Sequence, residues 1–283
     1  MNFQNIPRSN KLIKRAIVPK LDALAMFDYE QIEYRLLAYY MAVAIDDTRM
    51  AENFKAGIDA HTSLAIMLME FLGVEYTEPI TDEQRQMYGK TPNFAIVYAG
   101  GKPTIKRQLT KAGIPCDDKL ANKILKAIRG TMPGVKELME MLADEVKIKG
   151  YIFDLFGRHY RPDYTIPYND AVRKLLNALL QGCAAGLTRE AVVKVSKGCA
   201  ELGLRSHMVN VVHDEIIMDC AEDELPILAE QVPLWMGNAT VETIVPVTVG
   251  MEVAFENWAD KQEYDPTIIV PSRQVDVVRG TRW

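Results

Sequence analysis

Cysteine is scarce in this sequence, and the few cysteines present form no recognisable group. The four cysteines of the 283-residue chain are Cys116, Cys183, Cys199 and Cys220. They include no Cys-x-x-Cys pair and no cluster with histidine, which argues against a zinc site. We therefore expect free thiols in a reducing compartment.

The sequence also lacks a signal peptide, an apolar run long enough to cross a bilayer, an internal repeat and a low-complexity tract. Its composition, 48% hydrophobic and 25% charged residues, is ordinary for a globular protein. The length allows one large domain or two small ones. We therefore expect a soluble, cytoplasmic protein that does not associate with membranes.

Positive charge is in the minority, because the formal net charge is −5. The charges are nevertheless unevenly distributed. Residues 84–129 contain ten lysines and arginines against two acids, residues 214–263 contain twelve acids against one lysine, and residues 1–20 contain five basic residues and no acid. A basic surface beside an acidic one suits a site that binds phosphates and also holds a divalent metal. Taken alone, this uneven charge distribution is explained more simply by a charged surface that faces solvent.

Two acidic positions fall where predicted strands end. The apolar run 23–27 leads to Asp28 and is followed by apolar residues at helical spacing over 32–43. Residues 208–220 form two β-rich runs around a polar break at 213–215, which predicts a tight hairpin with its acids at the tip. Carboxylates at strand ends can meet at one sheet edge and hold Mg²⁺ together with substrate phosphates. Turn acids that face water are the simpler interpretation of these acids alone.

The rest of the chain alternates helical and irregular segments. Helices are predicted over residues 58–73, 120–128, 135–149 and 170–195, with a further helix start at 81–83. Strands are predicted over residues 151–156 and 243–253. The residues after Glu263 are aperiodic and predict a tail.

Local motifs around the two acidic positions resemble those of one enzyme family. Residues 27–35, FDYEQIEYR, resemble the D-Y-S-Q-I-E-L-R motif of family A DNA polymerases, which include bacterial DNA polymerase I and phage relatives. Residues 212–215, VHDE, resemble the family's V-H-D-E motif. Between them, the family pattern K-x-x-x-N-F-x-x-x-Y is matched by Lys90, Phe94 and Tyr98. The motifs stand in the family's order, and the resemblance covers roughly residues 2–260.

The resemblance implies an α+β fold, in which an antiparallel palm sheet is backed by helices and joined to a helical fingers subdomain. This is the right-hand polymerase fold without its thumb. The implied division is palm over 1–54 and 165–263, fingers over 55–164, and a C-terminal tail over 264–283. The implied activity is template-directed addition of dNTPs to a primer 3′ end by nucleotidyl transfer that uses two Mg²⁺ ions.

The resemblance also implies the catalytic residues. Asp28 and Asp214 would bind both Mg²⁺ ions, with the Tyr29 carbonyl as a further ligand. Lys90 would contact the phosphates of the incoming nucleotide, and Glu215 would be a secondary acid. Catalysis would then depend mainly on positioning and on neutralisation of charge.

A larger set is implied for nucleotide binding. Its members are Arg85, Gln86, Lys90, Phe94, Tyr98, Glu33, His61 and Gln31. Lys90, Phe94 and Tyr98 recur four residues apart and therefore share a helix face, on which Phe94 would pack on the sugar and base and Tyr98 near the template base. Glu33 matches the steric gate that excludes a 2′-hydroxyl, and His61 matches a histidine near the triphosphate. Without the flanking motifs, the same helix face would indicate a core stripe.

A second polar stripe is implied to bind DNA. Arg173, Asn177 and Gln181 also recur four residues apart, on an otherwise apolar helix, and match the family pattern R-x-x-x-N-x-x-x-Q. The resemblance implies contacts to template and primer from the minor-groove side, which sense pairing geometry rather than sequence. His213 would lie near the primer end. A solvated polar face is the alternative that the helix alone allows.

The fingers segment departs from the family pattern at two points. The family places an arginine four residues before the helix lysine, but Gln86 occupies that position here and Arg85 lies five residues before Lys90. In a regular helix this rotates Arg85 about 140° away from the lysine face. Pro92 removes a hydrogen bond from the same stretch. We expect a wider turn that returns Arg85 to the phosphates. The alternative is a regular helix that begins near Thr91, with Pro92 in its first turn.

Residues 2–7, NFQNIP, resemble the family's N-L-Q-N-I-P segment, so the sequence begins at Met1 inside a family motif. The segments that precede this motif in relatives include the thumb and any 3′–5′ exonuclease. We expect a gene split naturally, of the kind that phages carry, and a separate partner chain that bears the thumb and possibly the exonuclease. The protein would then bind primer–template DNA and dNTP in the host cytoplasm. A deliberately cut fragment is the alternative.

Two other functions compete with that of an active polymerase subunit. One is a catalytically silent, DNA-binding or assembly subunit of a phage replisome, against which the joint presence of Asp28, Asp214, Lys90 and Glu33 argues. The other is a single-subunit RNA polymerase, against which Glu33 and the V-H-D-E motif argue. We therefore expect a DNA-directed DNA polymerase.

Overall fold

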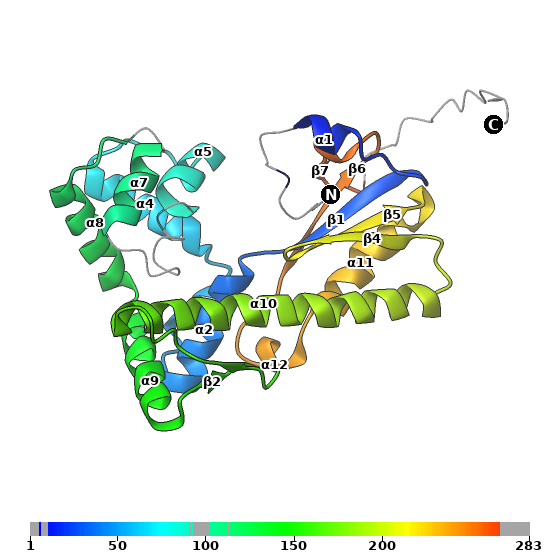
Figure 1. The fold of residues 1–283 in the computed structure, drawn as a ribbon. Helices are drawn as coiled ribbons and strands as arrows, with labels where there is room; N and C mark the ends of the chain where they lie inside the picture. The colour runs from blue at the N-terminus through cyan, green and yellow to red at the C-terminus, as the bar shows by residue number, and fades with distance from the viewer. Residues whose placement is uncertain (1–5, 7–10, 91, 93–101, 112–113, 267–283) are drawn as a thin grey trace. The chain divides into compact units, whose positions relative to one another are not determined.

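The protein is described by a computed structural model that covers residues 6, 11–90, 92, 102–111 and 114–266. The chain divides into two compact units (Figure 1). The first unit comprises residues 1–29, 190–236 and 249–283, and the second comprises residues 30–189 and 237–248. Each unit is described by itself below. The predicted α+β class is confirmed, because the first unit is built on a sheet and the second is mostly helical.

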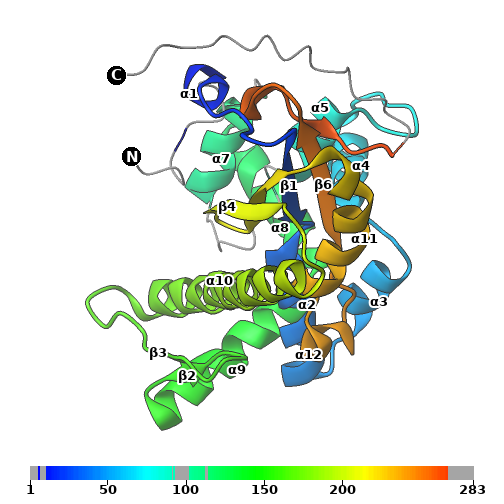
Figure 2. The ribbon, with the colours of Figure 1, turned by 90° about the vertical axis from the view of Figure 1, so that its right-hand side faces the viewer.

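The first unit contains a five-stranded antiparallel sheet with the strand order β4-β5-β1-β6-β7. The strands are β1 (Ala23–Tyr29), β4 (His207–Val212), β5 (Glu215–Cys220), β6 (Val249–Ala254) and β7 (Gln262–Glu263). The central strand β1 is buried at every residue except Asp28. Helix α11 (Leu225–Met236) contacts β1 and β6 (Figure 2). The antiparallel palm sheet that the motifs imply is therefore confirmed.

A small apolar cluster also covers the sheet. Its buried members are Leu24, Met26, Ile217, Ala254 and Trp258. Trp258 comes from the short 3₁₀ turn η4 (Trp258–Asp260), and its backbone N–H donates to the Ile17 carbonyl at 2.9 Å. This contact ties the segment before β1 to the segment after β6. It thereby fixes the chain segment that leads into the central strand.

The last long strand begins later than predicted. Residues 243–253 were expected to be extended throughout, but β6 begins at Val249. Pro246 has no N–H to donate to a neighbouring strand, and its carbonyl accepts a hydrogen bond from the Arg35 guanidinium. The Thr248 carbonyl accepts the backbone N–H of Glu30 at 3.0 Å. The Pro246 and Thr248 carbonyls thus bond to other residues of the second unit. The residues directly before Val249 are therefore irregular.

The second unit is a set of helices with one small hairpin. Its elements are α2 (Ile32–Ile45), α3 (Arg49–Lys55), α4 (Ala60–Leu72), α5 (Asp82–Gln84), η2 (Arg85–Lys90), α7 (Lys102–Lys111), α8 (Asp118–Thr131), α9 (Pro133–Lys149), β2 (Ile152–Phe153), β3 (His159–Tyr160) and α12 (Ala239–Glu242). Helix α10 (Tyr168–Glu201) contributes residues to both units. Helix α4 ends at Gly73 in the left-handed conformation, and α5 begins with a capping box at Thr81. Both signals agree with the sequence pattern.

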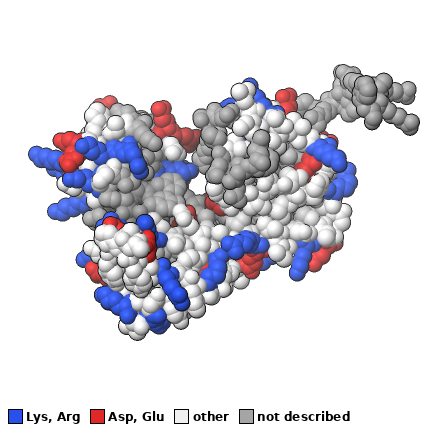
Figure 3. Space-filling model, in the orientation of Figure 1, with Lys and Arg blue, Asp and Glu red and all other residues white. Residues whose placement is uncertain are grey.

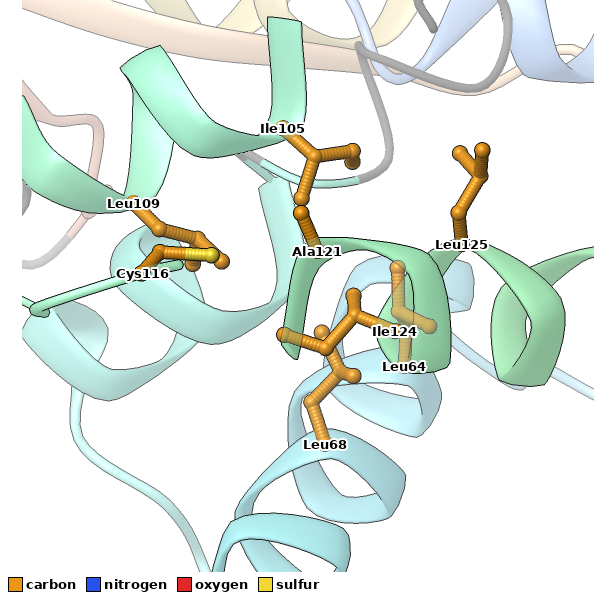
Figure 4. Close-up of a cluster of buried hydrophobic side chains, with 8 residues drawn as sticks. All are labelled: Leu64, Leu68, Ile105, Leu109, Cys116, Ala121, Ile124 and Leu125. Carbon is orange, nitrogen blue, oxygen red and sulfur yellow. The ribbon is translucent and has the colours of Figure 1, made fainter. Parts of the chain in front are cut away.

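Helices α4, α7 and α8 bury a common apolar core (Figure 4). Its members are Leu64, Leu68, Ile105, Leu109, Cys116, Ala121, Ile124 and Leu125. Each helix contributes residues three or four apart, which is the spacing that places side chains on one face. All four cysteines of the chain are free and buried, as expected. In the described part of the chain, none of the helices is both long and apolar enough to cross a membrane.

The strand expected over 151–156 is only two residues long. The buried Asp154 carboxylate accepts the backbone N–H groups of Phe156 and Arg158, both at 2.9 Å, and so closes a tight turn after β2. Pairing resumes in β3. An aspartate that bonds the backbone two residues further on favours a turn over a continued strand.

Candidate active site

Three acidic residues lie at one end of the sheet. In the strand register, Asp28 of β1 is opposite Glu215 of β5 on one side and opposite Gly250 of β6 on the other. Asp214 directly precedes Glu215, in the two-residue turn that joins β4 to β5. Residues opposite each other in an antiparallel pair have Cα atoms about 4.5–5.5 Å apart. The structure therefore places Asp28 and the two acids of the hairpin tip at one end of the sheet, and their joint role in binding a metal stays a prediction.

The hairpin turn itself is strained at His213. Its φ angle is 57°, the left-handed conformation that glycine adopts without cost. A non-glycine residue pays roughly 1–2 kcal/mol for this conformation. The left-handed conformation of His213 allows a connection of only two residues between β4 and β5. Asp214 therefore lies at the end of the sheet beside β1. The expected proximity of His213 to a primer end stays a prediction.

Glu215 forms an ion pair within this end of the sheet. Its carboxylate lies 3.1 Å from the Lys261 ammonium, which also contacts the Glu252 carboxylate. Burial acts to lower the pKa of Lys261, but Glu215 and Glu252 outweigh it and raise the pKa. The charge of Glu215 is thus balanced within the protein.

The residues at this end of the sheet fit a divalent cation that also binds substrate. Among the residues that the structure describes, no group of three or more histidines, cysteines, aspartates or glutamates could hold a metal by itself. Asp28 and Asp214 instead offer two carboxylates from adjoining strand ends. Mg²⁺ prefers oxygen ligands and is commonly held by one or two carboxylates plus phosphates and water. The donor set therefore fits Mg²⁺ with a phosphate-bearing substrate.

Tyr29 ends β1 and is firmly anchored. Its side chain is 3% exposed, and its hydroxyl donates to the Met236 carbonyl at 2.6 Å. Its backbone pairs with Val249 in β6. The anchoring holds the backbone that follows Asp28, and metal ligation by the Tyr29 carbonyl stays a prediction.

The fingers segment contains the wider turn that its sequence predicted. Residues Arg85–Lys90 form a π-helix, η2, rather than an α-helix. In a π-helix the hydrogen-bonded neighbours are five residues apart instead of four. Arg85 and Lys90 therefore stand in the relation that residues four apart have in an α-helix, and the extra residue is absorbed. Pro92 is helical and buried, whereas Thr91, Phe94 and Tyr98 lie outside the described residues.

Arg85 is bound by an aspartate that was not singled out from the sequence. Its Nη2 and Nε atoms lie 2.6 Å and 3.3 Å from the two carboxylate oxygens of Asp59. Asp59 is the N-cap of α4 and accepts the Thr62 backbone N–H at 2.5 Å. It also accepts the Gln31 side-chain amide at 2.7 Å. Burial acts to raise the pKa of Asp59, but the hydrogen bonds from Arg85 and Thr62 outweigh it and lower the pKa to about 2.

His61, in the first turn of α4, is buried against two neighbours. The side chain is 3% exposed, and its ring meets the Tyr34 ring edge-on at a centroid distance of 5.1 Å. Its carbonyl oxygen faces Gly89 of η2 so closely that a Cβ built on Gly89 would lie 2.0 Å away. Glycine at this position therefore lets η2 pack directly on the backbone of α4.

The protonation of His61 is set mainly by its burial. Burial lowers the pKa, Asp59 acts to raise it, and the positive charges of Arg85 and Lys90 lower it further, to about 4. The imidazole is therefore neutral near pH 7. A neutral ring can donate or accept a hydrogen bond, so the expected contact with a triphosphate would not rest on a charged histidine.

The remaining candidate nucleotide residues also belong to the second unit. Gln31 is the N-cap of α2 with a φ of 55°, and Glu33 is half-buried in the first turn of that helix. Lys90 is half-buried at the end of η2, and Gln86 is exposed. The amide oxygen of Gln31 is buried and has no hydrogen-bond partner among the described residues. Contacts of these residues with a nucleotide stay predictions.

The polar stripe of α10 is present as predicted. Arg173 lies 3.1 Å from Asp170 in an ion pair, and Gln181 is exposed. The side-chain oxygen of Asn177 is buried without a hydrogen-bond partner among the described residues. The neighbouring apolar residues of the helix are buried, namely Leu175, Leu176, Leu179 and Leu180. An unsatisfied amide on this stripe fits a position that a bound molecule would complete.

A basic surface covers α7 and α8 (Figure 3). The exposed basic side chains of these helices include Lys106, Arg107, Lys119, Lys123 and Lys126. Asp118 pairs with Lys106 and with the half-buried Lys102, in each case at 2.9 Å. One aspartate shared by two lysines leaves the surface strongly positive, which suits contact with a phosphate backbone.

Sequence reasoning missed two residues that organise the candidate site. Asp59 stands directly before a predicted helix, which signals an N-cap, but its pairing with Arg85 joins segments 26 residues apart. Lys261 pairs with Glu215 across 46 residues of sequence. Neither partner could be identified from local spacing. Both residues act by holding other side chains.

Comparison with known proteins identifies a family and a similar fold. The model of DNA polymerase family A matches residues 1–260. DNA polymerase I of Lactococcus lactis subsp. cremoris is 33% identical over 257 residues, which cover 88% of this chain and 28% of that protein. DNA polymerase I of Bacillus caldotenax is 33% identical over 269 residues, which cover 92% of this chain and 29% of that protein. This chain thus spans under a third of the length of these relatives.

A solved structure is similar as well. The POL domain of Pol1 from M. smegmatis, in complex with DNA primer-template and dNTP, is 26% identical and superposes with a TM-score of 0.71. The match covers 91% of this chain and 44% of that one. The motifs, the antiparallel sheet with its strand-end acids and these likenesses agree, and the chain belongs to DNA polymerase family A.

Proposed function

We propose that this chain carries the catalytic site of a template-directed DNA polymerase, which adds dNTPs to a primer 3′ end. The observation that carries the proposal is the register of the sheet, which places Asp28 opposite Glu215 and beside Asp214 in a chain of this family. The similar Pol1 domain was solved with primer-template and dNTP, which supports the same ligands here.

Asp28 and Asp214 would hold two Mg²⁺ ions, with the Tyr29 carbonyl as a further ligand. When bound, the ions would neutralise phosphate charge and make the primer 3′-hydroxyl a better nucleophile. Tyr29 anchors the end of β1 and the hairpin turn has only two residues, so the backbone that carries the two carboxylates would need little reorganisation when substrate binds. Lys261 keeps Glu215 in an ion pair and leaves it a supporting role.

The second unit would bind the incoming nucleotide. Arg85 and Lys90, brought into register by η2, would bind the triphosphate, and exposed Gln86 would contribute less. His61 and Gln31 would line the same site. Glu33 would lie under the sugar and exclude a 2′-hydroxyl. Phe94 would pack on the sugar and base of the nucleotide, and Tyr98 would lie near the template base.

The same unit would contact DNA. Arg173, Asn177 and Gln181 of α10 would read the minor-groove side of the primer end, and His213 of the first unit would lie near the 3′ terminus. The basic surface of α7 and α8 would contact phosphates. The division into palm (1–54 and 165–263) and fingers (55–164) is retained as part of the proposal.

We also propose that a separate chain bearing a thumb, with or without a 3′–5′ exonuclease, contributes to the grip on the duplex. The relatives are more than three times as long as the matched segment, so they contain parts that the match does not cover. Addition of such a chain would lower the concentration of primer–template needed for half-maximal extension. It would leave the rate per bound complex nearly unchanged.

Primer extension tests the proposal. The purified chain is given a primed template, Mg²⁺ and either dNTPs or rNTPs, with and without the thumb-bearing protein. The expected result is extension with dNTPs and no extension with rNTPs. Extension with rNTPs would indicate an RNA polymerase, and no extension under any condition would indicate a silent, DNA-binding subunit.

A further inference from the structure

Asp59 is the point at which three segments of the second unit meet. It caps α4, while Arg85 opens η2 and Gln31 precedes α2. One carboxylate oxygen accepts from Thr62 N–H at 2.5 Å and Arg85 Nε at 3.3 Å, and the other accepts from Gln31 Nε2 at 2.7 Å and Arg85 Nη2 at 2.6 Å. Two hydrogen-bond donors on each oxygen fill the acceptor capacity of a carboxylate.

Asp59 contacts only one edge of the Arg85 guanidinium. The bonded atoms, Nε and Nη2, form the side edge of the planar group. A guanidinium has five N–H donors, so the end edge, formed by Nη1 and Nη2, still presents a pair of donors. A pair of this kind matches two phosphate oxygens. Arg85 is 31% exposed. It can therefore bind a phosphate without leaving Asp59.

Asp59 also fixes the orientation of the Gln31 amide. An ionised carboxylate only accepts hydrogen bonds, so Gln31 has to turn its NH₂ group toward Asp59. Its oxygen then points away, and this oxygen is the buried atom without a partner among the described residues. A buried acceptor left unsatisfied costs roughly 1–3 kcal/mol. It is thus a place for a donor that a ligand brings, such as a hydroxyl or a water molecule.

We infer that Asp59 is the positioning residue of the triphosphate site. It would touch neither the nucleotide nor a metal, but it holds Arg85 and Gln31 in the directions in which they meet the nucleotide. The inference rests on the proposed function, in which both residues bind the nucleotide. Loss of the Asp59 charge would free the guanidinium and allow the amide to turn over, which weakens nucleotide binding without removing any group that touches the nucleotide.

The capping role of Asp59 has to be separated from its charge. Asn caps helices as well as Asp does, so Asp59→Asn keeps the cap of α4 and removes the negative charge. Asp117 provides the matched control. It caps α8 through the Leu120 backbone N–H at 2.7 Å, and no arginine contact of its side chain is found among the described residues. Asp117→Asn therefore makes the same change at a cap without the pairing.

The test measures the affinity of a fluorescent dNTP by anisotropy, with primer–template and Mg²⁺ present, and the KM and kcat of extension in parallel. We expect Asp59→Asn to weaken dNTP binding and raise KM by about tenfold, the effect of roughly one charge-assisted hydrogen bond, with a smaller change in kcat. Asp117→Asn should match the unchanged chain. In a chain that already carries Arg85→Gln and Gln31→Ala, Asp59→Asn should weaken dNTP binding further by less than about twofold.

Two results would overturn the inference alone: equal dNTP affinity in the Asp59 and Asp117 variants, or an undiminished Asp59 effect in the doubly substituted chain. Melting temperatures of both variants check that the comparison is made between folded proteins. If the unchanged chain neither binds nor incorporates dNTP, the proposed function fails together with the inference. Binding and extension by the unchanged chain keep the two outcomes distinct.

Discussion

At the scale of the single residue, Gly89 sets how closely η2 approaches α4. A Cβ at this position would lie 2.0 Å from the His61 carbonyl oxygen and 3.2 Å from the Ala65 side chain. The first of these neighbours is a backbone atom, so no flexible side chain can move aside. The same approach carries Arg85 to Asp59, which makes this packing part of the candidate site.

We predict that Gly89→Ala lowers the free energy of unfolding by about 1–3 kcal/mol, the usual cost of overpacking. Gly130, near the end of α8, is the control because a Cβ there meets nothing within 4 Å. Gly130→Ala should be neutral or stabilise by about 0.5–1 kcal/mol through helix propensity. Urea unfolding of both variants measures the difference. Equal stabilities would contradict the packing described for η2.

His61 predicts a pH dependence of stability. Its pKa falls from an ordinary 6.5 to about 4 in the folded chain, so below pH 6.5 the unfolded chain takes up a proton that the folded chain does not. Stability should therefore fall as the pH drops from 6.5 toward 4. Between pH 6.5 and pH 5 the loss from this residue is about 2 kcal/mol.

The measurement is urea unfolding at pH 7 and pH 5 for the unchanged chain, His61→Gln and the exposed control His207→Gln. His61→Gln should reduce the difference between the two pH values, and His207→Gln should not. Asp59 does not interfere, because its pKa of about 2 keeps it ionised at pH 5. An unchanged pH difference in His61→Gln would contradict the burial of a neutral imidazole.

At the scale of the element, the π-helix η2 compensates for an arginine that lies one residue away from the family position. A π-helical turn adds one residue to the spacing between turns, and Arg85 stands one residue further from Lys90 than the family arginine does. The close approach at Gly89 and the ion pair with Asp59 stabilise this turn.

This winding predicts which residue binds the triphosphate. Arg85→Ala should raise the KM for dNTP about tenfold or more, because the substitution removes a charge-assisted hydrogen bond to phosphate. Gln86→Ala, at the position of the family arginine, should change KM by less than about twofold. Steady-state primer extension measures both. A larger effect of Gln86→Ala would show that the π-helical turn does not bring Arg85 to the phosphates.

Most elements could be predicted because their signals are local. The hairpin 207–220, the stop of α4 at Gly73 and the start of α5 at Thr81 follow from alternation, a left-handed glycine and a capping box. The start of β6 could not be predicted, because the preceding carbonyls bond to Arg35 and Glu30, which are distant in sequence. The ion pairs of Asp59 and Lys261 could not be predicted either, because their partners are also distant in sequence.

At the scale of the whole molecule, basic and acidic residues are concentrated in different parts of the chain. The basic residues of α7 and α8 belong to the second unit, and the acids at the hairpin tip belong to the first. A net charge of −5 conceals this division. Binding of DNA by such a chain should depend on a local surface rather than on its overall charge.

We predict that replacing three exposed lysines of α8 with glutamine weakens DNA binding and its dependence on salt. The lysines are Lys119, Lys123 and Lys126. For every phosphate that is no longer neutralised, the slope of log affinity against log salt should fall by about 0.9. The control replaces three lysines of α9, each paired with an acid, namely Lys136, Lys147 and Lys149. Equal slopes for both triple variants would contradict a DNA surface on α8.

We propose that the strand-end carboxylates form the catalytic centre. The most direct test of this proposal is the rate of single dNTP incorporation by Asp28→Asn, with Asp46→Asn as control. Asp46 is exposed and left-handed at the end of α2, a conformation that asparagine tolerates. We predict a loss of about a thousandfold for Asp28→Asn and a change below about twofold for Asp46→Asn. Incorporation by Asp28→Asn at the rate of the unchanged chain would show that Asp28 is not part of the catalytic centre.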